Sequence, residues 1–355
     1  MTMSFSPGQF VLRPSTPEDL PAIERIAAAS TFGINSLPPD RDFLLARIER
    51  SQHAFQTLDD ASGEERYLFV LEDLAAGRVI GTSGIAASAG FHDRFYSYRN
   101  EFAVHASEAL GESNRIHTLH LCHDLTGYTL LTSFYIEPEY ADTVAPQLLS
   151  RARLLFIAEF AERFADRIAA ETPGLCDAGG NSPFWDEVGR RFFNMDYPQA
   201  ERLAGGRSKS FIAELMPHSP IYVPLLPETA QWAIGQLHPD GELPFSILLD
   251  EGFEADTYVD VFDAGPTVEA RLAMLRTVRH ARRATVVDAA VARGPWQLVT
   301  RTVREGFRAT LAPVDAHGPA GLDAATRARL GVSIGDAVRV SPLVVDEACG
   351  EEGEA

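Results

Sequence analysis

Histidine and cysteine side chains cluster in one short segment of the sequence, 115-RIHTLHLCHDLTG-127. Three imidazoles and a thiol are side chains that zinc prefers, so the composition of this segment suggests a metal site. The alternation of apolar residues predicts a β-strand, on which His117 and His123 face one side whereas His120 and Cys122 face the other. Because tetrahedral ligands cannot converge from opposite faces of a strand, we expect no metal site here.

A lone histidine is the second candidate for chemistry. His238 closes the apolar-periodic segment 228-ETAQWAIGQLH-238, and Pro239 prevents the predicted helix from continuing. At a helix C-terminus the macrodipole favours a protonated imidazole, which can donate a proton. A capping or buried histidine fits the same pattern and is the more common case, so the pattern alone leaves both roles open.

Two carboxylates lie close together in 258-YVDVFDAGP-266. Asp260 and Asp263 could bind an ammonium or guanidinium group, and they could equally be solvated residues at the end of a strand. The sequence contains no Walker loop, GxSxG, HExxH or CxxC motif, so the common signatures of nucleotide hydrolysis, serine and zinc hydrolysis and dithiol redox chemistry are missing.

An apolar strand, a turn and a long helix follow one another in 134-FYIEPEYADTVAPQLLSRARLLF-156. Such a helix start can bind a pyrophosphate on its free amides when the turn is rich in glycine, but this turn has neither glycine nor arginine. Pro146 removes one amide donor, Val144 adds a side chain, and Asp142 adds a negative charge. With Asp142 or Thr143 as its cap, the turn suits a helix start and not a phosphate site.

Composition limits the possible classes of protein. The chain has 355 residues, 45% of them hydrophobic, which is enough for a sizeable core and more than one domain. The net charge of −19 argues against nucleic acid as a partner. No apolar run reaches the length of a membrane span, the N-terminus lacks the pattern of a signal peptide, and the three cysteines imply no disulfide framework. We therefore expect a soluble, cytoplasmic protein.

The elements predicted for the first half form a mixed sheet with helices on both faces. The order is a strand near residue 10, helices over 17–30 and 41–55, a hairpin over 67–88 with its turn at 75–77, strands over 115–127 and 129–138, a helix to about Phe164, a strand over 167–174 and a helix over 181–197. In the last helix, a stripe at helical spacing predicts core residues, namely Phe184, Trp185, Val188, Phe192 and Phe193.

The second half repeats part of this order from about residue 205. A further helix is predicted to stop at Gly252-Phe253 before a strand that leads to residue 266. Strands follow over 284–291, 296–303, 306–314 and 336–345, with a short helix and turn within 327–340. We place one domain over residues 1–282, a small β-barrel-like module over 283–345, and a disordered tail over 346–355.

Several segments resemble the arginine N-succinyltransferase family. They are 34-INSLPPD-40, 104-VHAS-107, 119-LHLCHDLTGYTLLTSFYIEP-138, 182-SPFWDEVGRRFFNMDYPQAERL-203, 211-FIAELMPHSPIYVPLLPETAQ-231, 234-IGQLHP-239 and 258-YVDVFDAGP-266. The resemblance runs from about residue 11 to 285 and is greatest to the alpha subunits of two-subunit members that act on arginine and ornithine. It implies an α+β fold, the mixed sheet flanked by helices of the acyl-CoA N-acyltransferases, with the small β-rich module added at the C-terminus.

The resemblance also implies an activity and its residues. Members of the family transfer succinyl from succinyl-CoA, a co-substrate and not a permanent cofactor, to the α-amino group of arginine in arginine catabolism. The family's proton donor corresponds to His238, and its succinyl-CoA contact corresponds to Phe134. Backbone amides of the strand around Phe134, Tyr135 and Ile136 would polarise the thioester carbonyl.

The altered turn before the long helix leaves three hypotheses. In the first, the chain is an alpha subunit that works with a homologous beta subunit, which supplies the competent coenzyme turn. In the second, the chain is active alone. In the third, it is a non-catalytic structural or regulatory partner that has lost its own pyrophosphate loop.

Overall fold

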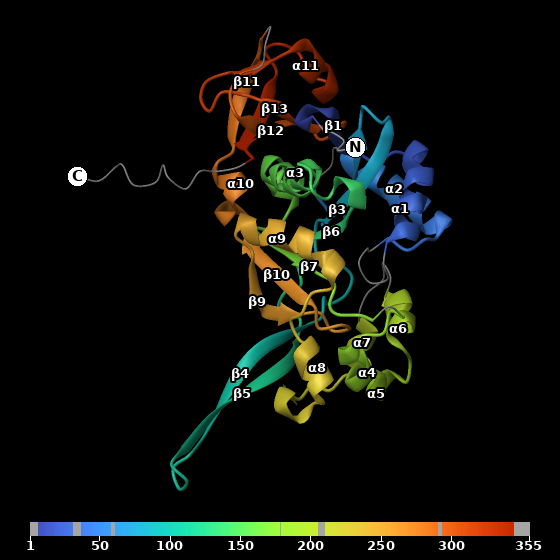
Figure 1. Ribbon diagram of the computed structural model, residues 1–355, viewed down its shortest axis with the longest axis vertical. Coiled ribbons are helices and arrows are strands. Elements are labelled where there is room, and N and C mark those ends of the chain that lie inside the picture. The colour runs from blue at the N-terminus through green and yellow to red at the C-terminus, as the bar shows by residue number, and fades with distance from the viewer. Residues whose placement is uncertain are drawn as a thin grey trace, which may run out of the picture.

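The computed structural model describes residues 6–30, 37–57, 61–177, 179–204, 210–289 and 293–343. Within these residues one continuous sheet has fifteen strands in the order β14-β11-β15-β12-β13-β1-β2-β3-β6-β7-β10-β9-β4-β5-β8 (Figure 1). Nearly all neighbouring strands are antiparallel, and β6 and β7 form a parallel pair near the middle of the sheet. The predicted mixed sheet flanked by helices is confirmed.

Ten strands lie in the described part of the chain before residue 282. They are β1 (Phe10–Pro14), β2 (Arg66–Asp73), β3 (Arg78–Ala86), β4 (Ser97–Ser107), β5 (Glu112–Cys122), β6 (Thr129–Ile136), β7 (Arg167–Glu171), β8 (Ile221–Tyr222), β9 (Glu254–Val259) and β10 (Pro266–Arg271). The helices of the same part are α1 (Leu20–Ala29), α2 (Arg41–Gln56), α3 (Ala145–Glu159), α4 (Pro183–Glu187), α5 (Gly189–Phe193), α6 (Tyr197–Ala204), α7 (Ser210–Leu215), α8 (Glu228–Ala233), α9 (Glu242–Glu251) and α10 (Arg276–Arg279).

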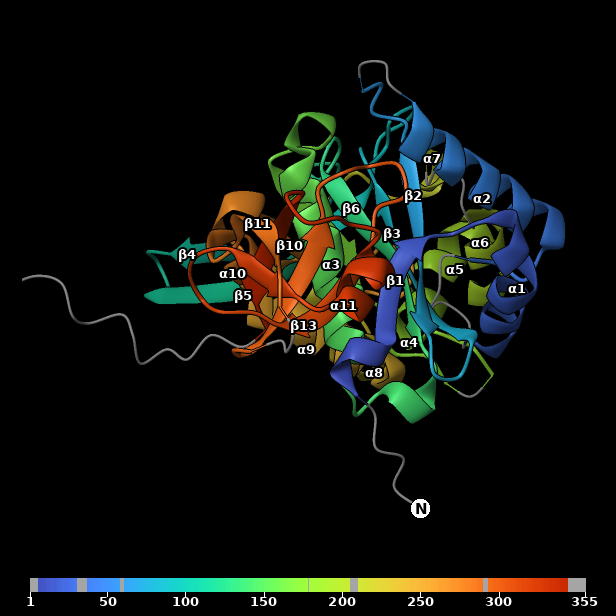
Figure 2. The same ribbon diagram turned by 90° about the horizontal axis from the view of Figure 1, so that it is seen from above.

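The central strands are buried on both faces, as the continuous apolar run 67-YLFVL-71 of β2 requires. Leu68 and Val70 pack against α1 and α2 on one face. Tyr67 and Phe69 face the other way and pack with the long helix α3. Figure 2 shows α1 and α2 at one side of the molecule and α3 across the sheet from them. Most of the core therefore lies around α3.

The C-terminal strands extend the same sheet. They are β11 (Arg282–Asp288), β12 (Trp296–Arg301), β13 (Ala309–Pro313), β14 (Ala320–Leu322) and β15 (Ala337–Pro342), together with helix α11 (Ala324–Leu330). Strand β13 pairs with β1 through Val11↔Thr310 and Leu12↔Ala309, so the β-rich C-terminal part is joined edge to edge with the first strand. The tail over 346–355 lies outside the described residues.

Two predicted helices are shorter than expected. The helix predicted over 181–197 breaks at Val188 and ends at the left-handed Asn194, which leaves Phe192 exposed instead of in the core. The helix predicted over 228–238 ends at Ala233, because Gly235 adopts a left-handed φ of 74°. The prediction that His238 lies at a helix C-terminus was therefore wrong.

Strand β4 was not predicted. It pairs with β5 along eleven residues, from Ser97↔Cys122 to Ser107↔Glu112, and this two-stranded arm extends away from the body of the molecule (Figure 1). Val104 and Leu110 near its tip are 69% and 76% exposed. Both faces of the outer arm meet solvent, so its sequence lacks the one-sided apolar pattern by which a strand is recognised.

Candidate functional site

The middle of strand β6 carries a β-bulge. The register between β3 and β6 shifts here, so that Ser133 and Phe134 together oppose Ser83. Ser133 has a φ of 55°, a left-handed conformation that non-glycine residues rarely adopt. Past this region the parallel pairing of β6 with β7 has stopped, since it comprises only Thr129↔Ile168 and Leu130↔Ala169 in the described chain. The bulged strand therefore has an open edge.

The strain at Ser133 gives a first prediction. We expect Ser133→Val to lower the free energy of unfolding by about 1–3 kcal/mol, because a β-branched residue is disfavoured at positive φ. Ser133→Gly should stay within about 1 kcal/mol of the wild type, since glycine adopts this conformation without strain. Chemical denaturation of both variants tests this. Equal stability of the two would show that the bulge relaxes and that its backbone is not fixed.

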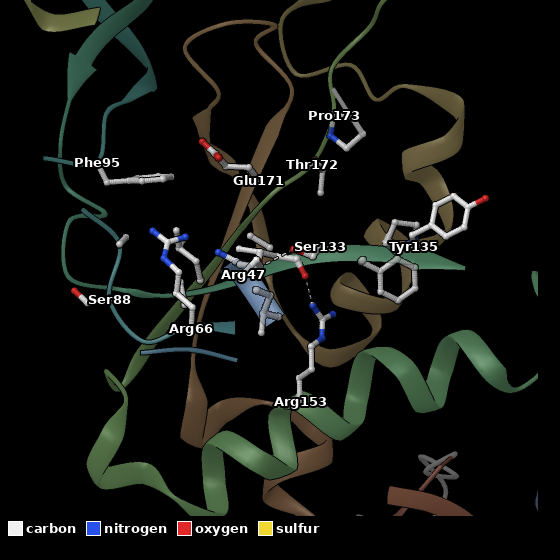
Figure 3. Close-up of a pocket in the computed structure, with 18 of the residues that line it drawn as sticks. Arg47, Arg66, Ser88, Phe95, Ser133, Tyr135, Arg153, Glu171, Thr172 and Pro173 are labelled. Carbon is white, nitrogen blue, oxygen red and sulfur yellow. Dashed lines mark hydrogen bonds between the residues drawn. The ribbon is translucent and has the colours of Figure 1, made fainter. Parts of the chain in front are cut away.

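A cavity of about 1440 Å³ lies along the open edge of β6. Phe134, Tyr135 and Ile136 line it, and so do Asp260 and Asp263. Figure 3 shows Ser133 and Tyr135 on β6 between α3 and the end of β7, where Glu171, Thr172 and Pro173 lie. The structure thus brings the predicted strand residues and the predicted carboxylates to one cavity.

Helix α3 supports the bulge through a buried arginine. Arg153 is 2% exposed, lies with its guanidinium 5.7 Å from the centre of the Phe134 ring, and places Nη1 3.5 Å from the carbonyl oxygen of Thr132. It also donates to the Ser150 hydroxyl at 3.1 Å. Burial lowers the pKa of Arg153 to about 9, so the side chain remains a cation at neutral pH. Pattern analysis missed this residue.

The start of α3 has few amides left for an anion. The Ala145 N–H donates to the Thr143 hydroxyl at 3.1 Å, and Pro146 follows with no N–H. The Thr143 hydroxyl itself donates to the Tyr140 carbonyl at 2.7 Å. Thr143 is thus the side chain that caps the first amide, one of the two residues expected to do so. Asp142 has no such bond at the start of the helix.

The two predicted carboxylates are buried, so the alternative of solvated strand ends was wrong. Asp263 is 4% exposed and accepts hydrogen bonds from the Gly174 N–H at 2.8 Å and the Tyr197 hydroxyl at 3.2 Å. Asp260 is 6% exposed and accepts from the Phe262 N–H at 2.7 Å. These bonds hold the turn between β9 and β10 against the end of β7 and place two carboxyl groups in the wall of the cavity.

His238 begins a short 3₁₀ turn, Pro239–Gly241, that leads into α9. Its Nδ1 accepts a hydrogen bond from the Asp240 N–H at 3.2 Å, and its own backbone N–H donates to the Pro173 carbonyl at 2.9 Å. The three residues after it line the cavity, while His238 itself is not among the lining residues. The histidine therefore lies beside the cavity at the start of the turn that leads into α9, and not at the helix end that the sequence suggested.

Arginines that the sequence analysis overlooked also line the cavity. Arg47 from α2 and Arg66 from the start of β2 both line it (Figure 3). The available signal was the position of Arg47 on the apolar side of its helix, between Leu44 and Ile48. Such a charge in a core stripe indicates either a buried ion pair or a ligand site.

The histidines of β5 do not converge on a metal ion. His117 lies beside Asn100 and stacks on Phe102, with ring centres 5.1 Å apart. His120 lies 3.2 Å from the Thr118 hydroxyl. In the part of the chain that is described, no three His, Cys, Asp or Glu side chains are grouped as metal ligands. No described helix is long and apolar enough to cross a membrane.

The family models and the relatives that match this chain carry the same family description. Residues 10–277 match the family model described as arginine N-succinyltransferase beta subunit, and residues 282–342 match the model of its C-terminal domain. The chain is 48% identical to arginine N-succinyltransferase subunit alpha of Pseudomonas aeruginosa over 93% of this chain and 98% of that one. It is 40% identical to subunit beta of the same organism over 94% of this chain and 98% of that one.

A solved structure is similar over nearly the whole chain. It is described as the structure of arginine/ornithine succinyltransferase subunit AI from Pseudomonas aeruginosa. The match has a TM-score of 0.86 and 44% identity, and it covers 95% of this chain and 100% of that one.

Proposed function

Because this chain belongs to the arginine N-succinyltransferase family, we propose that it transfers succinyl from succinyl-CoA to the α-amino group of arginine or ornithine in arginine catabolism. The observation that supports this most directly is the cavity along the open, bulged edge of β6, which is lined by both acidic residues and arginines. Since both substrates are intracellular metabolites, the enzyme works in the cytoplasm.

The chemistry requires a neutral amine, a polarised thioester carbonyl and a proton for the leaving thiolate. A free α-amine has a pKa near 8, so it loses its proton with little assistance. Its nitrogen attacks the thioester carbon, the C–N bond forms, the C–S bond breaks, the nitrogen loses one proton, and the thiolate takes one up. Of the backbone amides of Phe134, Tyr135 and Ile136, those directed to the open edge of β6 and not to β3 are suited to bind the developing oxyanion.

The chemistry of their side chains suggests roles for Asp260, Asp263 and His238. Asp260 and Asp263 attract the guanidinium or ammonium group of the acceptor, mainly through their electric field because their oxygens already accept backbone amides. His238 donates the proton to the thiolate from beside the cavity. The coenzyme is a co-substrate that lies along β6.

The start of α3 supports a two-subunit enzyme with this chain as the alpha-type subunit. The Thr143 hydroxyl occupies the first amide and Pro146 lacks one, so the usual anion site at this helix is weak. The exposed apolar tip of the β4–β5 arm also suits a protein partner, because a two-stranded ribbon is only marginally stable alone. The homologous beta subunit would then supply the competent coenzyme turn.

A mixing experiment tests this proposal. We expect the isolated chain to give little turnover with succinyl-CoA and arginine, and full turnover when a homologous beta-type subunit is added. Calorimetric titration of the isolated chain with CoA should give a Kd weaker than about 1 µM, because the diphosphate has no seat on α3. Full turnover by the chain alone would contradict the two-subunit part and leave the transferase activity intact.

The start of α3 also favours a second candidate, a non-catalytic partner that stabilises or regulates a competent homologous subunit. In that case substitutions around this cavity would not change the rate of the assembled enzyme. The histidine variants described in the Discussion separate the two candidates.

A further inference from the structure

Arg47 is a buried cation with no counter-charge in the described structure. Its residue is 4% exposed, and its Nε is fully buried without a hydrogen-bond partner among the described residues. The charges that act on it belong to Arg66 and Arg50, which repel it. Burial first, and then these two arginines, lower the pKa of Arg47 to about 9. The guanidinium is therefore still charged at neutral pH.

Arg66 lines the same part of the cavity and is partly buried. Burial, and then the charge of Arg50, lower its pKa. The one carboxylate next to it in the chain, Glu65, is 3.4 Å from Arg163 instead. Figure 3 shows Arg47 and Arg66 together on one side of the cavity, with Arg153 on the other side of β6.

Such an arrangement is costly unless a ligand completes it. An unpaired buried charge costs several kcal/mol, so folded proteins pair such groups or keep them for binding. A guanidinium presents a fixed fork of N–H donors that matches a carboxylate in a bidentate pair. Two of them at the wall of an open cavity form a site for a small anion.

The strand register places this site at the acyl end of the cavity. Arg66 on β2 is opposite Ala86 on β3, and Ala86 is opposite Leu130 on β6. Leu130 precedes Phe134 by four residues, whereas Pro138 and Ala141, which line the other end, lead into α3. A thioester whose carbonyl lies at the bulge therefore extends along β6 in the direction of α3 with its pantetheine arm and toward the two arginines with its acyl chain.

We propose that Arg47 and Arg66 bind a substrate carboxylate, which by position is the distal carboxylate of the succinyl group. This inference rests on the proposed function, since it assigns that activity its acyl selectivity. The α-carboxylate of the amino-acid acceptor has the same chemistry and is the other possible source. Butyryl-CoA, which lacks the distal carboxylate, and agmatine, which is arginine without its α-carboxylate, distinguish the two.

The proposal is tested by measuring the substrate selectivity of the Arg47→Met variant in the complete, active assembly. We expect kcat/KM with succinyl-CoA to fall about 10- to 100-fold, the effect of losing a charged hydrogen bond, while kcat/KM with butyryl-CoA changes little. The preference for succinyl-CoA over butyryl-CoA should fall by the same factor. If the preference for arginine over agmatine falls instead, the site binds the acceptor's carboxylate. If both preferences persist, the proposal is wrong.

The matched control is Arg41→Gln on the same helix. Arg41 is exposed, pairs with Glu24 at 2.6 Å and does not line the cavity. It should therefore leave both preferences unchanged. A change in selectivity of this variant equal to that of Arg47→Met would show a general effect of charge and overturn the assignment.

A melting experiment on the isolated chain gives a readout that does not depend on turnover. Without ligand, Arg47→Met should melt at a higher temperature than the wild type, because it removes a buried unpaired charge. Succinate should raise the melting temperature of the wild type and not that of the variant. These results would support the anion site even if no transfer were detected. A variant that melts lower and still responds to succinate would overturn it.

Discussion

Replacing His238 with alanine is expected to lower kcat of the assembled enzyme about 10²- to 10⁴-fold, the usual contribution of a general acid. The hydrogen bonds of His238 indicate that Nε2 is the nitrogen that donates the proton. Nδ1 accepts the Asp240 N–H, so the neutral ring carries its proton on Nε2. A proton taken up on Nδ1 would replace the bond from the Asp240 N–H and would face the Asp240 carboxylate, whose Oδ2 lies 3.8 Å from Nδ1. Steady-state rates with saturating succinyl-CoA and arginine measure the effect.

His238 also caps the turn that leads into α9, so His238→Ala removes both the cap and the imidazole. A second variant that keeps the cap is therefore needed as a control. His238→Asn keeps the cap, because an asparagine oxygen accepts the same amide, but asparagine does not transfer a proton near neutral pH. We expect His238→Asn to lose as much activity as His238→Ala. His280→Ala, which removes an exposed histidine bonded to a backbone carbonyl, should retain full activity.

The asparagine variant decides between a catalytic and a structural histidine. Wild-type activity of His238→Asn with low activity of His238→Ala would show that capping is the only role. Wild-type activity of both would favour the non-catalytic candidate for the whole chain. The position of His238 outside the cavity lining makes this the most informative substitution of the site.

Short sequence patterns were sufficient to predict many helix ends and turns of the fold. The stop predicted at Gly252 is confirmed, since this residue has a φ of 100° at the end of α9, a conformation that glycine adopts freely. The hairpin turn at residues 75–77 is confirmed for the same reason, with Gly77 at a φ of 62°. Ser182 caps the helix that begins at Pro183, by accepting the Trp185 N–H at 3.2 Å, as serine at this position commonly does. Each of these features depends on residues close together in the chain.

The errors arose where distant segments decide the structure. The strand pattern of β6 was visible, but its bulge depends on a register with β3 that no local pattern contains. Asp260 and Asp263 looked equally suited to solvent, because the partners that bury them, such as Gly174 and Tyr197, come from other parts of the chain. Arg47 was visible as a charge on an apolar face, yet only the fold shows that no acid among the described residues reaches it.

The second large effect concerns stability, and we expect Glu251→Leu to lower the free energy of unfolding by about 3–5 kcal/mol. The Glu251 side chain is fully buried at the end of α9, where it accepts the Thr277 N–H at 2.8 Å and hydroxyl at 2.7 Å. Its Oε1 lies 2.9 Å from Nε of Arg151, a side chain that is 3% exposed. Removing the carboxylate leaves this arginine buried without its closest counter-charge.

Replacing Arg151 together with Glu251 separates the effect of the ion pair from the effect of packing. Burial lowers the pKa of Arg151, and the charge of Glu251 opposes that shift, so the arginine is the group that suffers most when Glu251 is removed. Arg151 also donates to the Leu343 carbonyl, which ties α3 to the end of the C-terminal strands. We therefore expect Glu251→Leu combined with Arg151→Met to recover part of the loss, with a coupling of at least about 1 kcal/mol between the two sites in chemical denaturation. Additive losses would mean that each residue stabilises the fold through its own hydrogen bonds, and that the buried pair contributes nothing as a pair.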